Sequence, residues 1–150
     1  MSSPKKILFC ILLAFFILSF FLFSSASEMP SVLSMRERAA VFDSWLKIRL
    51  EKVLPELMRR ENFDMWLVIC REYNEDPVFL TLVPSTSFSA RRLTMLLFYD
   101  KGAEGVERLA VSRYGIRDFY KGVWEPEKIE QWQCLVKVIK ERNPRRIGIN

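Results

Sequence analysis

The sequence predicts an α/β domain with a mixed β-sheet and flanking helices. Apolar residues recur at helical spacing over residues 35–61 and again over 126–142. A continuous apolar run at 65–70 is typical of a strand that is covered on both faces. Two further strand-like segments, 93–99 and 106–112, are separated by turn-forming residues and predict a hairpin. Helices and strands that alternate in this way favour helices packed on a sheet.

The N-terminus has the organisation of a secretory signal. Lys5 and Lys6 precede an apolar stretch at residues 7–23, and small residues follow it. We therefore expect a signal peptide over residues 1–26, cleaved near Ala26, and an exported protein, either periplasmic or extracellular. The alternative is a retained membrane anchor, for which the apolar stretch is only marginally long enough.

Residues 27–150 form the expected single domain, and their composition excludes several functional classes. They carry 21 lysines and arginines against 18 acidic residues. This net charge of +3 is too small to predict nucleic-acid binding. The chain has no histidine, which excludes catalytic triads, the histidine zinc motif and histidine acid–base catalysis from this chain.

The first predicted helix contains a proline that interrupts its apolar face. Pro55 removes an amide donor and crowds the carbonyl four residues earlier, so residues 35–61 should form two helices or one kinked helix. We expect Pro55 near the second start. The apolar face of this pattern consists of Phe42, Leu46, Leu50, Val53, Leu54 and Leu57.

Start and stop signals in the sequence predict the last helix, and a strand is expected after it. Pro126 suits a first helical turn, and Asn143-Pro144 suits a stop, so a helix is expected over 126–142. Residues 145–150 then open another strand. A domain that ends on a fresh strand suggests that this chain is a fragment of a longer protein.

The tryptophans and cysteines have mainly structural interpretations. Trp45, Trp66 and Trp132 lie on apolar faces and are expected in the core, whereas Trp124 lies in a loop and either packs there or faces a partner.

Two cysteines lie after the expected signal peptide. Cys70 ends the buried strand and Cys134 lies in the last helix, which favours two separate thiols over a disulfide. Two cysteines without histidine make a poor metal site, so no metal ligand is predicted.

The strongest candidate functional segment follows the buried strand. Loops at the carboxyl ends of strands commonly carry ligand-binding residues in α/β folds. Three carboxylates there could bind a cation or a substrate amine, although acidic residues before a proline are also common in solvated loops. The candidate residues are Arg71, Glu72, Tyr73, Asn74, Glu75 and Asp76.

A second polar segment is rich in hydroxyls. Residues 85–89 contain four hydroxyl side chains and are followed by Arg91 and Arg92, a composition compatible with anion or phosphate binding. No glycine-rich phosphate loop accompanies them. The composition therefore favours a polar surface loop.

Three segments of the sequence resemble a known family. They read Leu-Pro-Glu-Leu-Met-Arg-Arg at 54–60, Asp-Met-Trp-Leu-Val-Ile at 64–69 and Arg-Glu-Tyr-Asn-Glu-Asp-Pro at 71–77. This pattern resembles the N-terminal domain of creatinase and Xaa-Pro aminopeptidase relatives. The likeness extends over about residues 36–150.

The resemblance implies that the chemistry lies in another domain. In that family a following C-terminal catalytic domain binds two divalent metals, manganese, cobalt or zinc, through Asp, His and Glu. The resemblance therefore implies no catalytic residue and no cofactor in this chain. It implies a homo-oligomer and a peptide substrate, with residues 71–76 at the substrate cleft or at an interface.

Two functional hypotheses follow. The leading one is a non-catalytic N-terminal domain of an exported Xaa-Pro aminopeptidase-like metallopeptidase that lacks its catalytic domain here and is inactive alone. The alternative is a free-standing exported α/β binding module without enzymatic activity.

Overall fold

A computed structural model of the chain describes residues 32–150, so the predicted leader at 1–26 lies outside the described residues. In chain order the elements are α2 (Met35–Ile48), η1 (Arg49–Val53), α3 (Leu54–Arg60), β1 (Met65–Arg71), α4 (Pro77–Leu82), β2 (Leu93–Asp100), η2 (Gly102–Glu104), β3 (Val106–Ala110), β4 (Lys121–Gly122), α5 (Gln131–Arg142) and β5 (Ile147–Ile149).

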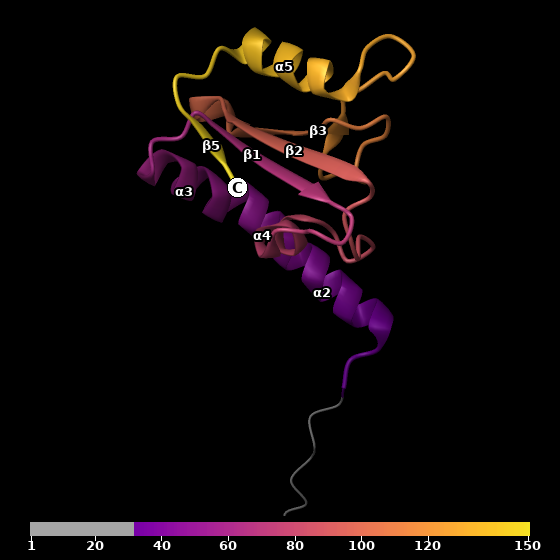
Figure 1. Ribbon diagram of the computed structural model, residues 1–150. Coiled ribbons are helices and arrows are strands. Elements are labelled where there is room, and N and C mark those ends of the chain that lie inside the picture. Colours follow the sequence, from indigo (N-terminus) through magenta and orange to yellow (C-terminus); the bar gives the residue numbers. More distant parts are fainter. Residues whose placement is uncertain (1–31) are drawn as a thin grey trace, which may run out of the picture. The chain divides into compact units, whose positions relative to one another are not determined.

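The five strands form one mixed sheet in the order β4-β3-β2-β1-β5, which confirms the predicted α/β class (Figure 1). β2 pairs antiparallel with β1 and with β3, so the predicted hairpin is present. β5 pairs parallel with β1, and β4 pairs parallel with β3. β2 therefore lies at the centre of the sheet.

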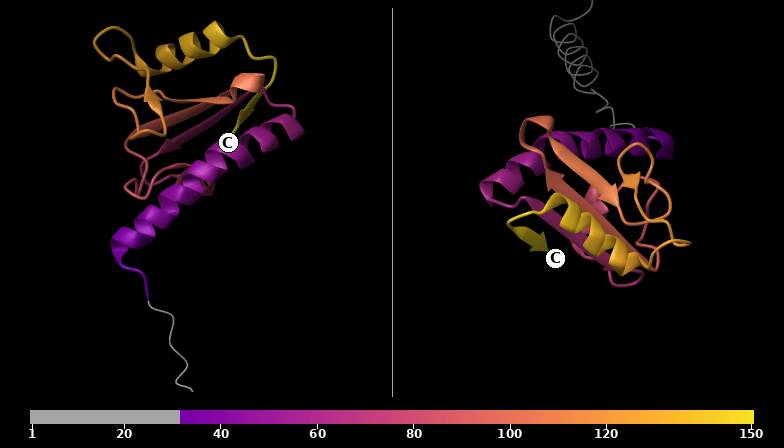
Figure 2. Two further views of the ribbon diagram at one scale, coloured as in Figure 1. Left: turned by 180° about the vertical axis from the view of Figure 1, so that it is seen from behind. Right: turned by 90° about the horizontal axis from the view of Figure 1, so that it is seen from above.

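Helices cover both faces of the sheet (Figures 1 and 2). Alternate residues of β1 point to opposite faces. Val68 and Cys70 belong to the core shared with α2, α3 and α4, whereas Met65 and Leu67 belong to the core shared with α5. The continuous apolar run in β1 is explained by this burial on both faces.

The first helix continues through the proline by widening one turn. The backbone N–H of Leu54 donates to the carbonyl of Arg49, five residues earlier, in the π-helical turn η1. Pro55 follows in the first turn of α3, where its missing donor is tolerated. The prediction of a second start near Pro55 is confirmed, and the interruption takes the form of a π turn.

The structure corrects the predicted start of the last helix and adds two elements. α5 begins at Gln131, not at Pro126, because Glu130 is extended and its carboxylate accepts the Trp132 backbone N–H at 2.8 Å as an N-cap. The predicted stop at Asn143 is confirmed, since Asn143 is left-handed and caps the helix. The short elements α4 and β4 were not predicted from the sequence.

Two tryptophan predictions are wrong. Trp45 is 58% exposed and Trp132 is 48% exposed, because each lies on the outer side of its helix. Trp66 packs against the core and Phe98, as predicted. Trp124 packs against the α5 core and donates its indole N–H to the carbonyl of Ile129 at 2.7 Å, which confirms loop packing.

The cysteine prediction is confirmed. Cys70 and Cys134 are buried free thiols that belong to different cores. No helix within residues 32–150 is long and apolar enough to cross a membrane.

Candidate functional site

Three loops leave the sheet at the same end. β1 finishes at Arg71 opposite Leu93, where β2 begins, and β3 finishes nearby at Ala110 opposite Leu96. The segments that follow or join these ends lie together at the carboxyl end of β1. We call residues 71–76, 83–92 and 111–120 the loop end.

The predicted site residues form a tight turn at the loop end. The backbone N–H of Asn74 donates to the carbonyl of Arg71 at 3.0 Å, which closes the turn. Tyr73 lies at its tip, 92% exposed, with a left-handed φ of 65°. Arg71, Glu72 and Asn74 are also exposed. These four side chains are therefore free to meet a partner or a substrate.

The other two predicted site residues hold the loop end together. A carboxylate oxygen of Glu75 accepts the Ala90 backbone N–H at 3.0 Å. The carboxylate of Asp76 caps α4 by accepting the Val78 N–H at 2.8 Å, and its second oxygen accepts the Asn150 amide at 3.3 Å. Within residues 32–150, no three Cys, Asp or Glu side chains converge as a metal site.

Backbone strain is concentrated at the loop end. Tyr73, Arg92 and Arg117 have φ values of 65°, 45° and 46°, in a region that bulky residues rarely adopt. The other described non-glycine residues with positive φ are Asn62 and Asn143, which follow helices and tolerate this conformation. Strained positions of this kind cluster at functional sites. The strained backbone at Arg92 and Arg117 was not predicted, because arginine carries no sequence signal for a left-handed conformation.

Asp43 of α2 ties two of the loops together. Its carboxylate accepts the Ser85 backbone N–H at 2.8 Å and pairs with the guanidinium of Arg117. Burial alone raises the pKa of Asp43, but the Ser85 hydrogen bonds and the Arg117 pair outweigh it and lower the pKa below its usual value. The carboxylate thus stays charged and holds loops 83–92 and 111–120 together.

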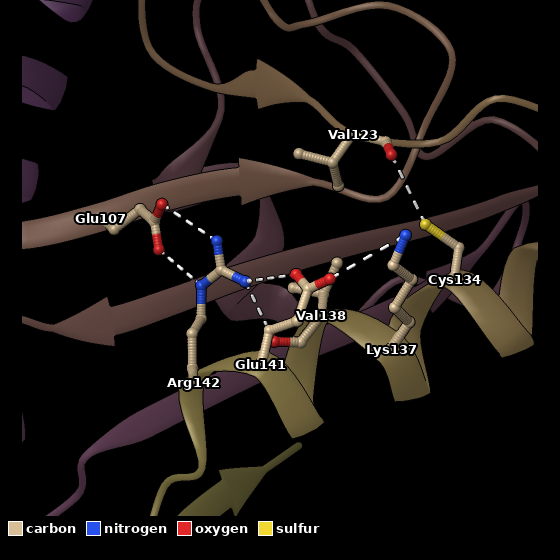
Figure 3. Close-up of polar contacts among 7 residues, drawn as sticks. All are labelled: Glu107, Val123, Cys134, Lys137, Val138, Glu141 and Arg142. Atoms are coloured by element: carbon tan, nitrogen blue, oxygen red, sulfur yellow. Dashed lines mark hydrogen bonds and ion pairs between the residues drawn. The ribbon is translucent and has the colours of Figure 1, made fainter.

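A second polar cluster lies between α5 and the face of the sheet that α5 covers (Figure 3). Arg142 donates to both carboxylate oxygens of Glu107, at 2.6 and 3.0 Å, and to the carbonyl of Val138. Nearby, burial raises the pKa of the Cys134 thiol, which lies 3.5 Å from the carbonyl of Val123. A protonated thiol is a poor nucleophile, so the raised pKa disfavours a nucleophilic role for Cys134.

The Glu107–Arg142 pair predicts a pH-dependent contribution to stability. The hydrogen bonds from Arg142 lower the pKa of Glu107, so its contribution is present above the unfolded pKa and is lost as the pH falls through the folded value. We expect Glu107→Gln to lower the free energy of unfolding by about 1–2 kcal/mol at pH 7. Urea titrations at a series of pH values should show this difference disappearing below about pH 4.

The matched control for that measurement is Glu104→Gln. Glu104 is exposed and its amine partner Lys101 lies at 3.8 Å, so its replacement should change stability by less than about 0.5 kcal/mol. A Glu107→Gln deficit that persisted unchanged at pH 3 would contradict the charge-based explanation.

Comparisons with known proteins identify no relative of this chain: no family model, no curated protein and no solved structure matches it.

Proposed function

We propose that this chain is the non-catalytic N-terminal domain of an exported Xaa-Pro aminopeptidase-like metallopeptidase, in which the loop end contributes to oligomer contacts and to the substrate cleft. The observation that carries the proposal is Tyr73, an aromatic side chain 92% exposed on a strained turn. Aromatic side chains are enriched among the residues that dominate binding interfaces.

The turn that presents Tyr73 is anchored on both sides. The Glu72 backbone N–H donates to the carbonyl of Arg92 at 3.0 Å, and Glu75 accepts the Ala90 N–H. A side chain on a fixed backbone loses less entropy on binding than one on a mobile loop. Together with the family resemblance of residues 71–77, this favours contact with a catalytic domain or a second subunit.

The metal chemistry in this proposal belongs to the C-terminal catalytic domain. Two divalent metals there, manganese, cobalt or zinc, would activate the water that hydrolyses the bond before proline. The histidine-free chain supplies neither the histidine ligand nor the histidine proton donors of that family. Its own contribution is to position subunits and to wall the cleft for a peptide substrate.

The mass of the native protein tests the proposal. An antibody to residues 27–150 and mass spectrometry of the C-terminal peptide should identify an exported product much heavier than 17.7 kDa, with metal-dependent cleavage of an Xaa-Pro peptide. A mature product that ends at Asn150 would overturn the proposal in favour of a free-standing binding module. So would metal-dependent cleavage by this chain alone.

The contribution of Tyr73 is tested by Tyr73→Asn in the native protein. Asparagine tolerates the left-handed backbone, so the fold should be retained. We expect kcat/KM for an Xaa-Pro peptide to fall by about tenfold or more, or the dissociation constant of the oligomer to rise by about tenfold or more. Trp132→Gln, at an exposed aromatic on α5, is the control and should leave both properties unchanged. If Tyr73→Asn and Trp132→Gln gave equal kcat/KM values and equal oligomer stability, Tyr73 would not be part of the interface.

A further inference from the structure

A cavity of about 330 Å³ opens at the loop end. It lies between residues 86–94 on one side and Ser112 and Ile116 on the other. This volume is at the lower end of the range for small-molecule sites. The turn that carries Tyr73 does not line it, so the cavity is a separate feature of the loop end.

One side of the cavity is polar. Thr86, Ser87, Ser89 and Arg91 line it, and their side chains make no hydrogen bond or ion pair with other residues in the range 32–150. The hydroxyl of Ser112 on the facing side donates to the carbonyl of Tyr114 and is already engaged. The unengaged groups on the first side are three hydroxyls and one guanidinium, all of them hydrogen-bond donors.

The backbone beneath these donors is fixed. The N–H groups of Ser85 and Ala90 donate to the carboxylates of Asp43 and Glu75, at 2.8 and 3.0 Å. The Arg91 N–H donates to the Thr94 hydroxyl at 3.1 Å, and the strained residue Arg92 follows. These hydrogen bonds fix the backbone of the loop, so its donors are preorganised along one side of the cavity, which favours binding.

The rest of the lining is largely apolar. Phe79, Val83, Leu93 and Ile116 contribute side chains from four different segments. Phe88, which is 85% exposed, forms an outer wall. An exposed phenylalanine beside a cavity provides a surface for an apolar group of a ligand.

We propose that this cavity binds the carboxylate of a small molecule that carries an apolar side chain, such as an amino acid or the C-terminus of a peptide. A guanidinium matches a carboxylate in a bidentate geometry, and the hydroxyls supply further donors. No Asp or Glu lines the cavity to repel an anion. One cation matches the single charge of a carboxylate better than the double charge of a phosphate. The site lies within this chain and needs no catalytic domain.

Calorimetric titration of the native protein with N-acetylphenylalanine and with its amide tests the proposal. We expect the acid to bind saturably and the amide to bind at least about tenfold more weakly, because only the acid pairs with Arg91. Arg91→Gln should weaken binding of the acid by about tenfold or more. Arg92→Gln is the matched control, since its side chain does not line the cavity, and should bind as the unaltered protein does.

Four results would overturn the proposal. They are equal binding of acid and amide, unchanged binding by Arg91→Gln, inorganic phosphate that binds more tightly than the acid, and no saturable binding up to about 10 mM. The acid–amide comparison uses the unaltered protein, so it decides the matter even if a variant folds poorly. These outcomes are independent of the mass and activity that test the proposed function.

Discussion

Replacing Phe98 by alanine is expected to lower the free energy of unfolding by about 3–5 kcal/mol. Phe98 is fully buried on β2, the central strand, and its ring lies 5.5 Å from that of Trp66 and 5.8 Å from that of Tyr120. Truncation would leave a cavity that the paired strands on both sides cannot close. Urea unfolding followed by circular dichroism measures the change.

Phe88→Ala is the matched control for Phe98→Ala. Phe88 is a phenylalanine with most of its side chain in solvent, so its removal should change stability by less than about 0.5 kcal/mol. A loss below about 1.5 kcal/mol for Phe98→Ala would mean that the sheet and α2–α4 do not share one tightly packed core.

Gly122→Ala is the second substitution with a large expected effect. A Cβ atom at this position would lie 2.6 Å from the carbonyl carbon of Tyr114 and 2.7 Å from the backbone nitrogen of Gly115. Both obstacles are backbone atoms, which cannot rotate away. We expect a loss of about 2–3 kcal/mol or more in urea unfolding. Displacement of the 111–120 loop should also weaken binding of N-acetylphenylalanine, because Ile116 lines the cavity.

Gly102→Ala separates steric crowding from backbone strain. Gly102 has a φ of 67° but nothing lies within 4 Å of an added Cβ. Its replacement should cost only the left-handed penalty of about 1–2 kcal/mol and leave ligand binding unchanged. If Gly122→Ala were tolerated as well as Gly102→Ala, the close approach of loop 111–120 to β4 would not be a feature of the folded protein in solution.

The sequence predicted the elements whose signals are local. The apolar run at 65–70 and the hairpin at 93–112 follow from burial and turn chemistry, and the structure has both. The helix α4 was missed although Asp76 and Pro77 provide an N-cap and a first-turn proline. At six residues, α4 is too short to show helical periodicity.

The π turn is explained by a row of buried residues that only the structure shows. The predicted apolar face lacked Met58 and included Val53 and Leu57, which are 42% and 39% exposed. Leu46, Leu50, Leu54 and Met58 are all buried at intervals of four. A regular α-helix has 3.6 residues per turn, so such a row would rotate away from the sheet by about 40° at each step. The wider turn η1 offsets this rotation. Pro55 indicated where the helix must adjust, but only the tertiary packing shows how.

The loop end could be predicted only as a location. The position of residues 71–76 after a buried strand pointed to it, and the hydroxyls of 85–89 suggested an anion site. The division of roles between exposed Tyr73 and the bracing carboxylate of Glu75 depends on the contact of Glu75 with Ala90, fifteen residues later. Contacts of this kind are set by tertiary structure and leave no local pattern.

The carboxylate–arginine pairs and two buried side chains have a consequence for the charge of the protein at different pH values. Arginine hydrogen bonds lower the pKa of Asp100 and Glu107, while burial raises the pKa of the Cys134 thiol and the Tyr120 hydroxyl. These shifts all lead away from neutrality, and the chain has no histidine to titrate there. These four groups should therefore carry the same charge in a mildly acidic compartment as at pH 7. A pH optimum near neutrality in the native protein would therefore report on protons held by groups other than these four.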